Sequence, residues 1–225
     1  MLYSGNMRLK RRMLVSLFIS VVPSNTARVV LHRVINRYKI APGARIGMFT
    51  ILACDQATIG RATIGMFNRF LGPFSLELED GVTTGWFNLF ECLFDITDSR
   101  FSAFGFKRAC TIGKNVSVGE NHFIDATDGF YVGEGSWIAG RDSQFWTHGA
   151  FGSGPVAIGS MCYVGSAVRF SPGAGVGNHC LVALGSVVTK RFDNEYLTVG
   201  GVPARVINEE HDWTTGGPGD KRESP

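Results

Sequence analysis

The sequence predicts an all-β solenoid, a left-handed parallel β-helix preceded by an N-terminal α-helical extension. The main observation is a period of six. An aliphatic or aromatic residue occupies every sixth position over residues 158–188, and these are Ile158, Val164, Phe170, Val176, Val182 and Val188. A period of six suits neither an isolated helix nor an isolated strand, but it suits a chain that coils through three short strands per turn. The 29 glycines, against a usual share of about 7%, favour the tight corners of such a coil.

The same period extends the predicted solenoid domain over residues 41–207, with several slips. The pattern is least clear between residues 85 and 107, a segment rich in Phe and Trp. Here it indicates outward loops or aromatic packing on the surface. Leu76, Phe94 and Ile112 nevertheless follow one another at intervals of one full turn of three hexapeptides, so we expect them to stack on successive coils.

Residues 1–40 are predicted to form a basic helical extension. They contain eight Lys and Arg and no Asp or Glu, whereas the rest of the chain, with 14 basic and 19 acidic side chains, has a net charge of −5. Such a basic arm suits an anionic partner such as a membrane surface, although the same cations could simply cap and solvate the helices. The apolar run 13–22 is too short to span a bilayer. We expect a retained helix on the open end of the solenoid or on a membrane, and a loosely ordered polar tail over residues 208–225.

The five cysteines include two pairs with the spacing of one predicted turn. Cys162 precedes Cys180, and Cys92 precedes Cys110, by three hexapeptides, so each pair should stack on neighbouring coils. Small inward-facing thiols suit a reducing compartment. This favours a cytoplasmic protein, or one peripheral at the inner face of the membrane.

Two interruptions of the repeat carry the candidate chemistry. The intervals from Ile112 to Val132 and from Ile138 to Ile158 each exceed a full turn of three hexapeptides by two positions, so each coil should hold a bulge. The bulges, residues 125–130 and 145–150, align Thr-Asp-Gly with Thr-His-Gly at an offset of one such lengthened turn. This alignment predicts that Asp128 and His148 project from adjacent coils on the same side.

His148 is the candidate general base. An imidazole titrates near neutral pH, and an adjacent carboxylate would fix its tautomer and strengthen it as a base. Asp128 is the predicted partner, with Asp125 and Asp142 as rivals. Trp146, next to His148, and Asp142 are candidates for binding the acceptor. Three histidines at metal-binding spacing cannot be assembled, so no metal site is expected.

These residues resemble the hexapeptide-repeat acyltransferase superfamily, and among its members the sugar O-acetyltransferases that act on maltose, galactosides and polysaccharides. The resemblance rests on the repeats over residues 158–190 and on Gly-Ser-Val-Val-Thr-Lys at 185–190, followed by Gly-Val-Pro-Ala-Arg at 201–205. It implies a homotrimer with active sites between the solenoids, acetyl-CoA as co-substrate, and His148 as the base for the acceptor hydroxyl. The family's substrate-binding Asn corresponds to Asp125 here, a departure that affects the identity of the acceptor.

The resemblance also implies a coenzyme A site. Its contacts correspond to Ser166, Ala183, Leu184, Gly185, Thr189, Lys190 and Arg205. Leu184 stands where the family usually has Ala, and Arg191 replaces a common Asp. That added cation could help to hold a phosphate.

Three functions are compatible with these residues. The favoured one is an acetyl-CoA-dependent O-acetyltransferase acting on a sugar hydroxyl of a glycan or polysaccharide precursor. An N-acyltransferase acting on an amino-sugar nucleotide would use the same base, but the bulges offer few cations for a nucleotide besides Arg141. A non-catalytic β-helix scaffold is the alternative from another class. No nucleic-acid partner is expected.

Overall fold

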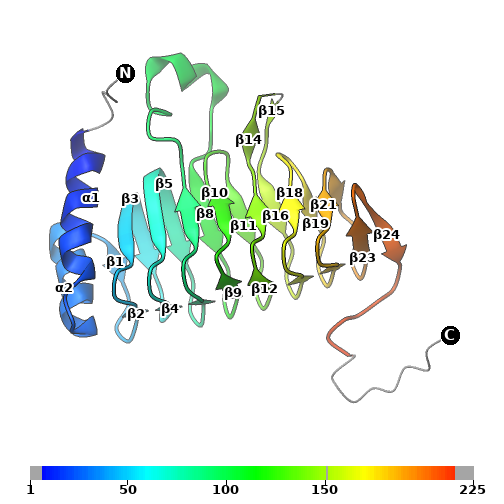
Figure 1. The fold of residues 1–225 in the computed structure, drawn as a ribbon, viewed down its shortest axis with the longest axis horizontal. Helices are drawn as coiled ribbons and strands as arrows, with labels where there is room; N and C mark the ends of the chain where they lie inside the picture. Colours follow the sequence, from blue (N-terminus) through cyan, green and yellow to red (C-terminus); the bar gives the residue numbers. More distant parts are fainter. Residues whose placement is uncertain (1–6, 151, 216–225) are drawn as a thin grey trace.

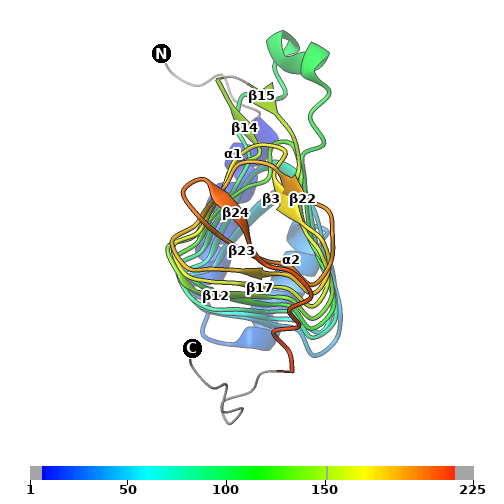
Figure 2. The same ribbon diagram turned by 90° about the vertical axis from the view of Figure 1, so that its right-hand side faces the viewer.

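The chain winds as a parallel β-helix of three faces, with two helices at its N-terminal end (Figure 1). The computed structural model describes residues 7–150 and 152–215. Seen along the axis, the coils form a rounded triangle (Figure 2). The two helices are α1 (Met7–Ser20) and α2 (Asn25–Ile35).

Each coil places one strand on each face, and strands on one face pair in parallel with their neighbours. The first face consists of β3 (Ile51–Ile59), β5 (Arg69–Leu78), β7 (Leu89–Glu91), β10 (Phe123–Asp125), β13 (Gln144–Phe145), β18 (Arg169–Phe170) and β21 (Val187–Val188). The second face consists of β1 (Lys39–Ile40), the second halves of β3 and β5, β8 (Ala109–Ile112), β11 (Phe130–Val132), β16 (Val156–Ile158), β19 (Gly175–Val176) and β22 (Arg191–Phe192).

The third face consists of β2 (Arg45–Ile46), β4 (Thr63–Ile64), β6 (Thr83–Thr84), β9 (Ser117–Glu120), β12 (Trp137–Arg141), β17 (Tyr163–Val164), β20 (Leu181–Val182) and β23 (Thr198–Gly201). At its end, β24 (Ala204–Asn208) pairs antiparallel with β23. We call the corner between the first and second faces the insertion edge, because the two long insertions leave the coil there. The corner between the third and first faces is called the smooth edge.

The period of six marks the core as predicted. Val164 pairs with Val182, Ile158 with Val176, and Phe170 with Val188, each pair joining equivalent positions of neighbouring coils. All six periodic residues from Ile158 to Val188 are buried. Burying each of these side chains contributes about 1.5–3 kcal/mol, so the stacked interior stabilises every coil against the next.

Glycines at the corners let successive coils approach closely, which provides a test of the stacking. A Cβ at Gly159 would lie 2.5 Å from backbone atoms of Gly177 on the next coil, and backbone cannot move aside locally. We expect Gly159→Ala to lower the free energy of unfolding in urea by about 1–3 kcal/mol. Gly149→Ala is the matched control, because its Cβ would meet only Pro172 Cγ at 4.0 Å. Equal losses in the two variants would contradict close stacking at Gly159.

The blurred segment is a long excursion, and the expected stacking of Phe94 is wrong. Ile112 pairs with Leu78, so the coil that joins them is much longer than a regular turn. Residues 92–108 leave this coil at the insertion edge and form the 3₁₀ helix η1 (Ser99–Phe104). The Cys92–Cys110 stack is also wrong for this reason. Cys110 lies on β8 between Leu76 and Phe130, whereas Cys92 follows β7 on another face.

The polar C-terminal segment begins by folding back on the solenoid. Trp213 Nε1 donates a hydrogen bond to Met161 O at 2.7 Å, and its ring lies 5.4 Å from that of Tyr163. Residues 209–215 of the predicted tail are therefore anchored on the third face, and residues 216–225 lie outside the described part of the chain.

Candidate active site at the insertion edge

Two insertions leave the insertion edge and flank one short turn. The excursion 92–108 connects β7 to β8, and the antiparallel hairpin of β14 (His148–Gly149) and β15 (Gly152–Ser153) connects β13 to β16. The turn 126–129 lies on the coil between them, because β10 pairs with both β7 and β13. Figures 1 and 2 both show the two insertions projecting from the same side of the solenoid.

The Asp125 carboxylate is buried beneath this turn, and both of its oxygens accept backbone hydrogen bonds. Its side chain is 1% exposed. Oδ1 accepts from Thr127 N at 2.9 Å, and Oδ2 accepts from Thr147 N at 2.8 Å and from His148 N at 3.1 Å. Burial would raise the pKa of Asp125, but the hydrogen bonds from His148 and Thr127 outweigh it and leave that pKa below its ordinary value. The group is therefore an ionised carboxylate held in one orientation.

His148 completes the pair. Its Nδ1 lies 2.6 Å from Asp125 Oδ2, and 26% of its side chain is exposed. The ionised partner accepts a hydrogen bond from Nδ1–H, so Nε2 is the ring nitrogen left to act as a base. The hydrogen bond to Asp125 raises the pKa of His148; partial burial opposes the rise, and the charges of Asp125, Glu91 and Asp128 add to it. This geometry would suit a general base with an orienting carboxylate.

Asp128, the partner predicted from the aligned bulges, makes no hydrogen bond to His148 among the described residues. Its Oδ1 instead accepts from Lys107 N at 3.3 Å, and its own N–H donates to Thr147 Oγ1 at 2.9 Å. Asp125, weighed as a rival partner and as an acceptor ligand, is the carboxylate that contacts the imidazole. Because its side chain is buried and both of its oxygens accept hydrogen bonds from the chain, Asp125 is not exposed to bind an acceptor.

The prediction of Asp128 was wrong because of register. Ile124 pairs with Phe145, so Asp125 comes to lie under residues 146–148. The repeat also predicts Ile138 and Ile158 to be equivalent positions of successive coils. They lie on different faces, because Ile138 pairs with Val164 on the third face and Ile158 pairs with Val132 on the second. The hairpin of β14 and β15 accounts for the extra residues between β13 and β16. A one-residue error in register changes which side chain meets its neighbour.

Glu91 is the acidic neighbour that the sequence pattern did not reveal. It pairs with Asp125 on the adjacent coil, although the whole excursion separates the two residues in the chain. Burial raises the pKa of Glu91, and the charge of Asp125 raises it further. Predicting that Glu91 lies beside the site would have required the length of the excursion between β7 and β8. The sequence pattern does not give that length.

The other two candidates for binding the acceptor, Trp146 and Asp142, lie on different parts of the coil. Trp146 is 40% exposed and packs on Phe123 with ring centroids 4.4 Å apart, on the first face beside His148. Asp142 lies on the smooth edge, where it accepts from Asn121 Nδ2 at 2.5 Å and lies 3.5 Å from Arg141 Nε. The structure therefore brings Trp146, but not Asp142, to the neighbourhood of His148.

The residues expected at coenzyme A lie on two edges of the protomer. Ser166 and residues 183–185 occupy corners of the smooth edge, and Leu184 there is 79% exposed. Thr189 and Lys190 form the corner between β21 and β22, on the insertion edge. Arg205 lies on β24 opposite Gly200, exposed at the C-terminal end. One protomer alone does not gather this set on a single edge.

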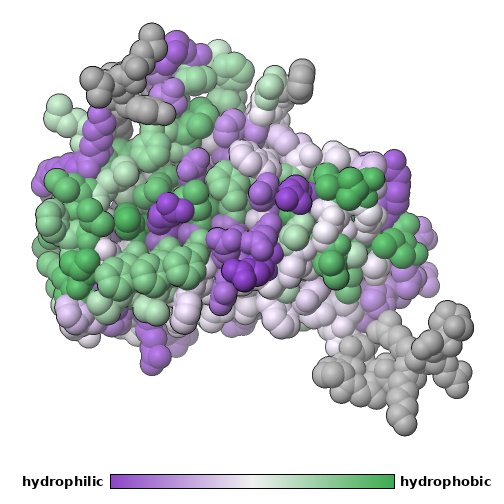
Figure 3. All heavy atoms as spheres, in the orientation of Figure 1, coloured by the Kyte–Doolittle hydropathy of each residue, from purple (hydrophilic) through white to green (hydrophobic). Residues whose placement is uncertain are grey.

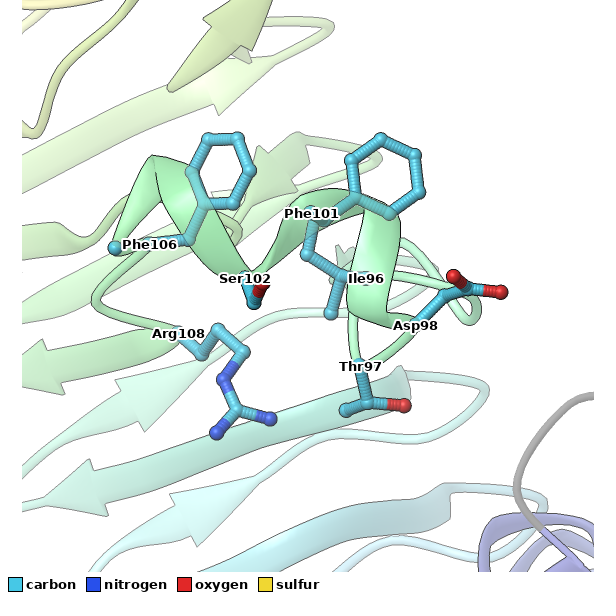
Figure 4. A pocket seen from close by; sticks show the side chains of 8 residues that line it. Ile96, Thr97, Asp98, Phe101, Ser102, Phe106 and Arg108 are labelled. Atoms are coloured by element: carbon cyan, nitrogen blue, oxygen red, sulfur yellow. The ribbon is translucent and has the colours of Figure 1, made fainter.

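Two hollows accompany the insertions. One, about 310 Å³, is bordered by the hairpin and by Pro172 of the next coil, directly beyond His148. The other, about 270 Å³, lies under the excursion, with Arg108 on its floor and Phe101 and Phe106 above it (Figure 4). Arg108 N donates to Thr127 O at 3.0 Å, so this second hollow adjoins the turn that covers Asp125.

Other buried histidines have structural roles. His122 Nδ1 accepts from Ser143 N at 3.0 Å, and burial lowers the pKa of His122 to about 4. His32 packs on Tyr38 at the helical end, and burial lowers its pKa to about 4 as well. Over residues 7–150 and 152–215, no cluster of three His, Cys, Asp or Glu side chains could hold a metal ion.

Comparison with known proteins connects this fold to acetyltransferases. No protein-family model matches the sequence. The galactoside O-acetyltransferase of Escherichia coli is 32% identical over 102 residues, which is 45% of this chain and 45% of that protein. A proposed acetyltransferase of Saccharomyces cerevisiae is 33% identical over 124 residues, which is 47% of this chain and 63% of that protein. The chain thus matches less than two thirds of the length of either curated relative.

A solved structure extends the likeness beyond the matched sequence. The polysialic acid O-acetyltransferase OatWY has a TM-score of 0.59 with 17% identity, over 78% of this chain and 86% of that chain. The likeness confirms the predicted left-handed parallel β-helix. The resemblance found in the repeats is confirmed by the two sequence relatives, because one is named an O-acetyltransferase and the other a proposed acetyltransferase.

Proposed function

We propose that the protein is an acetyl-CoA-dependent O-acetyltransferase that acts on a sugar hydroxyl of a glycan or polysaccharide precursor. The observation that carries the proposal is the His148–Asp125 pair, an oriented imidazole with Nε2 available, in a corner turn of the β-helix. Similarity to the galactoside O-acetyltransferase of Escherichia coli supports the choice of acyl group and acceptor class.

The proposed reaction is direct transfer. His148 Nε2 takes the proton from the sugar hydroxyl as its oxygen attacks the thioester carbonyl of acetyl-CoA, and backbone N–H groups at a coil corner stabilise the oxyanion. When the intermediate collapses, the C–S bond breaks and the imidazolium returns the proton to the departing thiolate. The products are an acetyl ester and coenzyme A. A cysteine route is disfavoured, since all five thiols are buried.

The split of the expected coenzyme A contacts between two edges supports a homotrimer. In such an assembly the smooth edge of one protomer, with Ser166 and Leu184, can face the insertion edge of the next, with His148 and Lys190. The cations Lys190 and Arg205 are exposed and suit the phosphates of coenzyme A. A cytoplasmic location, where acetyl-CoA is made available, is part of the same proposal.

Thermal shift with acetyl-CoA, followed by transfer assays, tests this function. We expect acetyl-CoA at 100 times its dissociation constant to stabilise the folded protein by about 2.7 kcal/mol. A panel of sugars should then release free coenzyme A thiol in a sugar-dependent manner. Absence of any shift at saturating acetyl-CoA would favour a non-catalytic scaffold, and transfer to amino-sugar nucleotides alone would indicate an N-acyltransferase.

A further inference from the structure

Helix α1 exposes large apolar residues and buries polar ones, unlike an ordinary surface helix. Such helices normally turn their apolar stripe inward and their polar side chains to solvent. Here three of the five buried residues are polar, Arg12, Ser16 and Ser20, and the other two are the apolar Leu9 and Ile19. The outward side carries large apolar residues, and these are Met7, Leu14, Leu17 and Phe18, followed by Val21, each at least half exposed.

This burial of polar residues has a cause in the solenoid. The first coil of a β-helix leaves strand carbonyls without a partner at its open end, and buried carbonyls require donors. Arg12 Nη1 donates to Cys54 O at 2.7 Å and to Asp55 O at 2.6 Å, and Ser16 Oγ donates to Leu52 O. The polar residues of α1 thus satisfy the coil, and four large apolar residues of the helix face outward.

Helix α2 repeats the arrangement. Arg28 is buried and donates to Ile46 O through Nε at 3.0 Å and Nη2 at 2.7 Å. On the outward side Val30, Val34 and Ile35 are 46%, 70% and 45% exposed. We define the cap surface as Leu14, Leu17, Phe18, Val21, Val30, Val34 and Ile35. Figure 3 shows hydrophobic residues gathered at this helical end of the molecule.

A basic hollow adjoins the cap surface. It measures about 250 Å³ and lies between α1 and the end of α2. Four arginines line it, Arg8, Arg11, Arg12 and Arg37, together with Val15, Ile35 and Asn36, and the lining itself has no acidic residue. Arg12 is also paired with Asp55, whose Oδ1 lies 3.4 Å from its Nη1. Guanidinium groups bind phosphate with two parallel hydrogen bonds. The hollow is therefore suited to a phosphate group at the border of an apolar surface.

We propose that the cap surface docks on an anionic lipid membrane. Helices α1 and α2 would lie on the membrane surface, and a lipid phosphate would occupy the arginine hollow. An anionic bilayer offers an apolar layer beneath a negative surface, which matches both properties of the cap. A second cap would match the apolar residues but not the charge, because residues 1–40 carry eight cations and no acid, and two caps would repel each other. Among the described residues no helix has the length and hydropathy to cross a bilayer, so the contact is peripheral.

Cosedimentation with vesicles tests the docking. The full chain should bind vesicles of phosphatidylcholine with phosphatidylglycerol, bind phosphatidylcholine alone much more weakly, and lose binding at high salt. The double variants Leu14→Ser with Phe18→Ser, and Arg11→Glu with Arg37→Glu, should each lower the partition coefficient by more than about tenfold. Phe104→Ser is the matched control, a 63% exposed aromatic residue on η1, and should bind as wild type.

Several results would overturn the proposal. These are equal binding to both kinds of vesicle, no effect of the Leu14 and Phe18 substitutions, or the same loss in Phe104→Ser. A concentration-dependent dimer in light scattering that only the cap variants abolish would assign the surface to a second copy instead. Acetyl transfer to a sugar in solution, measured in the same variants, should be retained, which separates failure of docking from failure of the proposed enzyme.

Discussion

Replacing His148 with alanine is expected to lower kcat for acetyl transfer by about 10²–10⁴-fold, the usual worth of general-base catalysis. Without the imidazole, no group at the insertion edge that the structure describes stands in the same relation to a buried carboxylate. The side chain is 26% exposed and belongs to a hairpin outside the core, so the fold should persist. Steady-state rates, with the acetyl-CoA thermal shift measured alongside, separate lost chemistry from lost binding.

His179→Ala is the control for this variant. It removes an imidazole that packs on Tyr196 with ring centroids 4.6 Å apart, in the turn between β19 and β20 and away from the insertion edge. We expect its kcat to stay within a few-fold of wild type. If His148→Ala kept wild-type kcat, or if both variants lost activity equally, His148 would not be the base.

The regular coils could be predicted from sequence because their residues obey a purely local rule. Over residues 158–188 every sixth side chain points inward, and the observed pairing of each such residue with the third one after it follows from that period alone. His148 could be found by the same rule, since it interrupts the repeat. The partner of His148 could not, because insertions of unknown length shift the register of every neighbouring coil. Asp125 and Asp128 lie close together in the chain, and only the pairing of Ile124 with Phe145 decides between them.

The helical cap shows a second limit of sequence reasoning. Composition and periodicity predict helices in residues 1–40, but which side of a helix faces inward depends on what it packs against. Arg12 and Arg28 look like solvated cations in the sequence, yet both are buried on strand carbonyls of the first coils. Because these carbonyls need donors, polar residues share the inward face with Leu9, Ile19 and Val29, and hydrophobic periodicity alone does not identify that face.

The second large effect is expected for Asp125→Asn. Oδ1 and Oδ2 of Asp125 each accept at least one backbone N–H, so the amide NH₂ would face a donor in either orientation. Leaving such a buried group unsatisfied costs about 1–3 kcal/mol, and the imidazole loses its fixed orientation. We expect kcat to fall by at least about tenfold, but by no more than in His148→Ala, in assays at the pH optimum.

The pH dependence of this variant distinguishes an orienting carboxylate from a merely structural one. His148 is a base only when neutral, so the rate should fall as the pH drops through its pKa. The hydrogen bond to Asp125 raises that pKa above its ordinary value of 6.5, so the wild-type inflection should lie above pH 6.5. In Asp125→Asn the charge is gone, and the inflection should move to lower pH. Asp128→Asn, which removes only a more distant charge, should shift it less; an equal or larger shift would make Asp128 the partner after all.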